Sequence, residues 1–159
     1  MRLRPSAVIV GNTFGSSAKR LASAGMGASF AFFFATGGGT FHKGGTFSAG
    51  TTQTAKNAVI GRFTNSGYGD VAITTATGIV MLLGNGAAFT MGPSTSYPYP
   101  LSAFSNGQFE ESADFDKDGK LDLAVNGPGF ILIFWGGGNG SFTSASALSQ
   151  SSFPRSMAV

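Results

Sequence analysis

Four of the seven acidic residues of this 159-residue chain fall within nine positions, so one short segment is the strongest candidate for chemistry. Two carboxylates about 4 Å apart repel each other by roughly 1 kcal/mol in water, and by roughly 4 kcal/mol at an effective dielectric constant of about 20. Two lysines in the same segment, Lys117 and Lys120, are expected to point elsewhere and to offset this repulsion only in part. A bound cation would remove it. The acids follow the pattern D-x-D-x-D-G-x-x-D and are Asp114, Asp116, Asp118 and Asp122.

The spacing of these acids suits Ca²⁺, which takes several hard oxygen ligands, and Gly119 permits the sharp turn that such a loop requires. The carbonyl of Lys120 is a plausible backbone ligand. The segment is not an EF-hand, because the twelfth position counted from Asp114 is Val125 rather than a bidentate glutamate. A solvated acidic hairpin without metal is the alternative interpretation.

The element that carries the acids is repeated along the chain. Residues 113–125 align without a gap with residues 61–73, so that Gly119 corresponds to Gly67 and Asp122 to Asp70. A more degraded copy at 11–23 has lost every acid. We therefore expect calcium in the third copy alone, and we expect Arg62 to act as an internal cation facing Asp70 in the second.

Each copy predicts four short strands, because an apolar run ends in a glycine turn closed by Phe at 33–41, 82–89 and 134–142. The expected fold class is all-β, with about three four-stranded antiparallel blades of a β-propeller. The chain is interpreted as a single propeller segment, 1–159, with repeats at about 5–55, 56–107 and 108–152, while 153–159 starts the next blade. Three blades are too few for a closed ring, so we expect a fragment of a longer protein or a ring completed by self-association.

The segment SADFDKDGKLDLAV, followed by FILIFWGGGNGSF, resembles an FG-GAP or VCBS-type repeat, the blade of integrin-alpha-like propellers. The resemblance implies a multi-bladed propeller in which the acidic hairpin loop binds calcium between two strands of a blade. It also implies that the ligands are the side chains of Asp114, Asp116, Asp118 and Asp122, together with the Lys120 carbonyl.

Several other functions are disfavoured by composition. The ten basic residues are scattered, which argues against nucleic-acid binding, and no apolar run approaches the roughly 20 residues of a membrane-spanning helix. Without cysteine there is no disulfide or thiolate zinc site. The single histidine, His42, has no identifiable catalytic partners, and the adjacent Glu110 and Glu111 would point to opposite faces of a strand. We therefore expect no enzymatic activity.

The expected function is a calcium-stabilised propeller module of an exported or cell-surface protein, used for adhesion or for binding an unknown protein or glycan. Extracellular calcium would saturate even a weak site, which makes an extracellular location sensible. One alternative is a carbohydrate-binding propeller lectin, for which the aromatic stretch 93–101, with Tyr97 and Tyr99, is the first place to look. Another is the non-catalytic part of a larger secreted enzyme.

Overall fold

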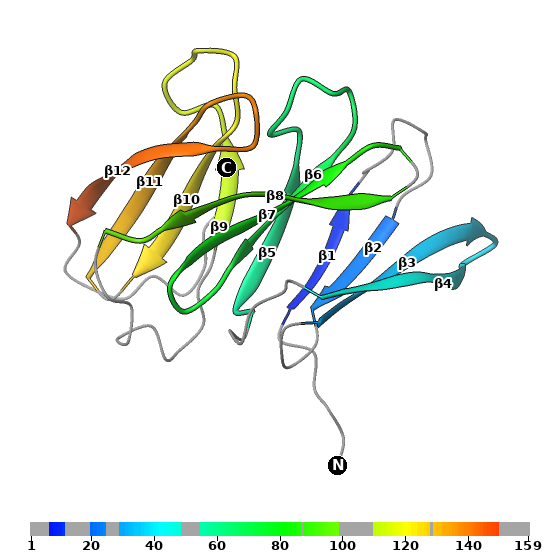
Figure 1. Ribbon diagram of the computed structural model, residues 1–159. Helices are drawn as coiled ribbons and strands as arrows, with labels where there is room; N and C mark the ends of the chain where they lie inside the picture. Colours follow the sequence, from blue (N-terminus) through cyan, green and yellow to red (C-terminus); the bar gives the residue numbers. More distant parts are fainter. Residues whose placement is uncertain are drawn as a thin grey trace.

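The computed structural model describes residues 7–11, 20–24, 29–48, 55–86, 88–98, 110–127 and 129–149. Within these ranges the chain forms three four-stranded antiparallel sheets, and within each sheet consecutive strands pair with each other (Figure 1). The predicted all-β architecture of propeller-like blades is therefore confirmed, whereas the exact repeat boundaries stay a prediction. The described part of the chain holds no helix long and apolar enough to span a membrane.

Each sheet is a meander of four consecutive strands. The first comprises β1 (Ala7–Gly11), β2 (Arg20–Ala24), β3 (Ser29–Gly37) and β4 (Thr40–Ser48). The second comprises β5 (Asn57–Gly61), β6 (Asp70–Thr74), β7 (Gly78–Gly84) and β8 (Phe89–Ser96). The third comprises β9 (Glu110–Ala113), β10 (Asp122–Gly127), β11 (Phe130–Gly136) and β12 (Phe142–Ser149).

The central strands of the second sheet are buried on both faces. All five residues of β6, with the sequence DVAIT, are buried, and so are six of the seven residues of β7, GIVMLLG. A strand covered on both sides has no solvent face on which polar residues would alternate with apolar ones. This explains why β7 is a continuous apolar run. The outer strand β8 holds only half-buried and exposed residues.

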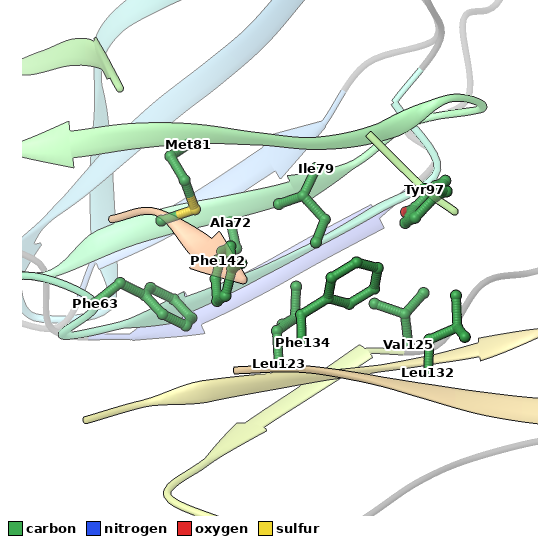
Figure 2. Close-up of a cluster of buried hydrophobic side chains, with 10 residues drawn as sticks. All are labelled: Phe63, Ala72, Ile79, Met81, Tyr97, Leu123, Val125, Leu132, Phe134 and Phe142. Carbon is green, nitrogen blue, oxygen red and sulfur yellow. The ribbon is translucent and has the colours of Figure 1, made fainter. Parts of the chain in front are cut away.

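The three sheets stack through their first strands, because β1 lies beside β5 and β5 lies beside β9. A hydrophobic core fills the space between the second and third sheets (Figure 2). Its phenylalanine rings pack edge to face: the centroids of Phe63 and Phe142 are 5.6 Å apart at an interplanar angle of 70°. The buried members of this core are Phe63, Ala72, Ile79, Met81, Tyr97, Leu123, Val125, Leu132, Phe134 and Phe142.

Backbone hydrogen bonds also join these two sheets at the end where their loops emerge. The N–H of Gly140, in the turn between β11 and β12, donates to the carbonyl of Phe63 at 3.0 Å. Thr64 forms an isolated antiparallel bridge with Asn139 in the same turn. The loop that follows β5 is thereby attached to the neighbouring sheet as well as to its own.

Candidate metal centre

The acidic segment forms the connection between β9 and β10. These two strands pair antiparallel, with Ala113 opposite Asp122, so residues 114–121 close a hairpin. In Figure 1 this loop (yellow) projects from the same end of the sheets as the loop that joins β5 to β6 (green). The fold therefore places the acids where the sequence analysis expected them, at the end of a blade.

Two of the aspartates hold the turn through backbone hydrogen bonds. The Asp114 carboxylate accepts the N–H groups of Asp118 at 3.0 Å and Gly119 at 2.9 Å, and Asp116 accepts the Asp118 N–H at 3.1 Å. Gly119 has a φ of 86° and its counterpart Gly67 has a φ of 83°. This left-handed backbone region favours glycine, so the requirement for glycine in the turn is confirmed.

Three acids converge at the base of the loop. Asp114, Asp116 and Asp122 each offer a carboxylate oxygen, and these oxygens all lie within 4.8 Å of one another. Calcium binds oxygen at about 2.3–2.6 Å, so two oxygens on one ion lie at most about 5 Å apart. Asp116 is exposed, which leaves an entry path, whereas Asp122 is only 1% exposed. The donor set and its spacing therefore fit a calcium ion.

Asp118 lies outside this cluster and forms an ion pair with Lys120 instead. The Lys120 Nζ atom is 2.5 Å from Asp118 Oδ2, and the Lys120 backbone N–H donates to Asp118 Oδ1 at 2.9 Å. The side-chain hydrogen bond lowers the pKa of Asp118 and raises the pKa of Lys120. The expectation that this lysine points away from the acids is wrong. The ligand roles of Asp118 and of the Lys120 carbonyl stay predictions.

Asp122 has a second task that the sequence analysis missed. Its Oδ2 atom accepts the N–H of Phe115 at 2.8 Å, and its Oδ1 atom accepts the N–H of Gly136, at the end of β11, at 2.8 Å. One carboxylate thus fastens the start of the loop to the third strand of the same sheet. Because both donors are backbone N–H groups, 7 and 14 residues away along the chain, no local side-chain pattern predicts these contacts.

Asp70 plays the corresponding part in the second sheet. Its Oδ2 atom accepts both the N–H and the hydroxyl of Thr64 at 2.9 Å, and its Oδ1 atom accepts the N–H of Gly84 at 2.9 Å. Gly84 ends β7 as Gly136 ends β11. The survival of this acid alone in the second copy was the signal that could have revealed the role.

The expected contact between Arg62 and Asp70 is not formed. Arg62 is exposed, and no ion pair joins the two side chains, both of which lie in described ranges of the chain. Neutral donors from Thr64 and Gly84 occupy the carboxylate oxygens instead. The loop between β5 and β6 is therefore held together without an internal cation.

The remaining candidates differ in outcome. Glu110 is buried and Glu111 is half-buried on the same strand, as their adjacency predicted. His42 is exposed on β4. The interpretation of Tyr97 as an exposed recognition residue is wrong, because it is only 8% exposed and its ring centroid is 5.7 Å from that of Phe134. Tyr99 lies outside the described residues.

Comparison with known proteins supports the assignment of the acidic hairpin. Residues 114–159 match the FG-GAP-like repeat family. No curated protein matches the chain. The match begins at Asp114, the first acid of the loop, and continues past β12. The match confirms the resemblance seen in the sequence for this segment, which holds an FG-GAP-like repeat.

Proposed function

We propose that this chain is a calcium-stabilised β-propeller module of an exported or cell-surface protein, used for adhesion or ligand binding and without catalysis of its own. The observation that carries the proposal is the convergence of Asp114, Asp116 and Asp122 within 4.8 Å at the end of a blade. The FG-GAP-like match over 114–159 supports the module type. Calcium at extracellular concentrations occupies sites with dissociation constants of about 10⁻⁴–10⁻³ M, which favours an exported protein.

The three carboxylates would hold the ion, and the ion would neutralise their mutual repulsion. Asp122 is also bonded to the N–H groups of Phe115 and Gly136. A ligand fixed in this way is already oriented before the ion arrives, so little conformational entropy is lost on binding. The stabilisation would reach the sheet through the contact with β11.

The proposed contact surface for a partner is the end of the sheets from which the two loops project (Figure 1). Each loop exposes an aromatic ring there, Tyr68 on one and Phe115 on the other. Exposed aromatic residues are enriched in protein interfaces and can also stack on sugars. The partner is therefore proposed to be a protein or a glycan, which is bound beside the calcium loop.

Thermal unfolding of the protein with saturating calcium and with a chelator tests the proposal. Calcium at about 100 times its dissociation constant stabilises a one-site protein by about 2.7 kcal/mol. We expect calcium to raise the melting temperature of the natural chain and to have little effect on Asp116→Ala. Ser66→Ala, in the loop that lacks the acidic cluster, is the matched control and keeps the full calcium response. Equal melting temperatures of the natural chain with and without calcium would remove the structural role of the ion.

A further inference from the structure

The first residue of β9, Glu110, places a carboxyl group in the interface between the second and third sheets. It lies opposite Val125, a member of the core between these sheets, and directly paired residues share one face of a sheet. Glu110 is 5% exposed, and neither of its carboxyl oxygens has a hydrogen-bond partner among the described residues. The residue in the same place of the second repeat is Ala58, which is also buried. The third repeat thus has a buried carboxyl group at the position where the second repeat has the methyl group of alanine.

Among the described residues, no positive charge on the same strand or on the second sheet compensates the Glu110 carboxyl. Lys56, just before β5, donates its backbone N–H to the Thr74 carbonyl, and it forms no ion pair with Glu110 among the described residues. Strand β5 itself carries no titratable side chain. Thr74, at the end of β6, donates its hydroxyl to the Asn57 carbonyl at 3.4 Å.

The other ionisable groups near Glu110 in the described part of the chain are all acids. Tyr97, which follows β8, is buried and coupled to Glu110: burial first, and then this carboxyl, raises the pKa of the tyrosine. Glu111 is the adjacent residue on β9. The acids Asp70 on β6 and Asp122 on β10 begin their strands at the loop end, where backbone N–H groups hold them.

We propose that Glu110 is neutral in the folded protein at neutral pH and that its ionisation makes the interface between the second and third sheets sensitive to alkaline conditions. An ionised carboxylate in an apolar interface without a partner is far more costly than the neutral acid. This proposal does not depend on calcium or on the proposed function.

The direction of the pH dependence follows from burial. Desolvation raises the pKa of Glu110 well above its usual range. The nearby Thr74 hydroxyl, which donates to the Asn57 carbonyl rather than to this carboxyl, lowers the pKa in part, and the charge of Glu111 raises it further. Between the pKa of the unfolded chain and that of the folded protein, the folded state binds one more proton. The stabilisation is complete below the unfolded pKa and is lost as the pH rises through the folded pKa. Across that window the folding equilibrium constant falls by up to about tenfold per pH unit.

Urea unfolding of the 159-residue chain across about pH 5 to pH 9, at saturating calcium, tests the proposal against Glu110→Gln. Glutamine keeps the shape of the side chain and cannot ionise. We expect the natural chain to lose stability relative to the variant as the pH rises. The control Glu111→Gln, at the half-buried neighbour, keeps this decline. Parallel stability curves for the natural chain and Glu110→Gln would overturn the proposal.

A direct titration covers the case in which Glu110→Gln fails to fold. The sequence contains two glutamates, Glu110 and Glu111, so glutamate-selective ¹³C labelling yields two side-chain carboxyl signals. The Glu111→Gln spectrum identifies the signal of Glu110. A signal that titrates well above the ordinary glutamate range supports the proposal. A signal that titrates at about pH 4.3, the value of an exposed glutamate, overturns it.

Discussion

Replacement of Asp70 by alanine tests whether one carboxylate holds a loop without any metal. The side chain is 0% exposed and accepts the backbone N–H groups of Thr64 and Gly84, both at 2.9 Å. It also accepts the Thr64 hydroxyl at 2.9 Å. In Asp70→Ala both N–H groups lose their acceptor. The contact to Gly84 is buried and the contact to Thr64 is partly buried, so water can replace only the second.

The magnitude follows from these two orphaned donors. A buried donor left without an acceptor costs about 1–3 kcal/mol, and a partly solvated one lies at the low end of that range. We expect Asp70→Ala to lower the free energy of unfolding by about 2–4 kcal/mol. Asp70→Asn should cost less, because one amide oxygen still accepts while the amide nitrogen faces the other N–H.

The matched variant in the third sheet is Asp122→Ala. Asp122 makes the same two kinds of backbone contact, to Phe115 and Gly136, so without calcium its removal should cost about as much as that of Asp70. With calcium at about 100 times its dissociation constant, Asp122→Ala should lose up to about 2.7 kcal/mol more. Asp70→Ala should show no such increase.

Equilibrium urea unfolding of both variants and the natural chain, with calcium and with chelator, measures all four differences. A cost of less than about 1 kcal/mol for Asp70→Ala would mean that water satisfies the freed N–H groups and that the carboxylate is not what holds the loop. If calcium increased the loss of stability caused by Asp70→Ala, the inference that the ion acts at the Asp122 loop and not at the Asp70 loop would be refuted.

Two further changes test packing and charge. Phe63→Ala should lower the free energy of unfolding by about 3–5 kcal/mol, because Phe63 is 2% exposed. Phe115→Ala, at the corresponding but 39% exposed position, should lower it by about 1 kcal/mol or less. Urea unfolding measures both changes. If the two substitutions lowered the free energy of unfolding by similar amounts, burial of Phe63 between neighbouring sheets would not be what makes it more important than Phe115. Lys120→Gln should tighten calcium binding by up to about fivefold in isothermal titration, because it removes a cation that competes for Asp118; unchanged affinity would contradict this competition.

Local features of the fold were predictable from the sequence. The apolar run of β7 indicates a buried strand, and Gly67 and Gly119 indicate tight turns, because both features depend only on residues close together in the sequence. The repeat then transfers each local inference to the next copy. Hence the arrangement of four strands per sheet and the position of the acidic hairpin could be inferred without coordinates.

Contacts between distant residues could not be inferred in this way. Tyr97 follows a polar, proline-containing strand and looks exposed until the third sheet supplies Phe134 as its neighbour. Asp118 and Asp116 are indistinguishable in an alternating pattern, yet the reach of Lys120 separates them. The Asp122 carboxylate accepts the N–H of Gly136, which is 14 residues away at the end of β11, and no rule of sequence spacing predicts this hydrogen bond.

The carboxylate at the base of the loop in the second and third sheets has a consequence for how such repeats can vary. Asp70 keeps its loop attached to β7 although the three acids before it have been replaced. The attachment of this loop to β7 therefore does not require the other acids of the motif. The residue that fastens the loop is thus separable from the other acids proposed to hold an ion, so neighbouring hairpins can differ in their response to cations while each stays fastened to its sheet.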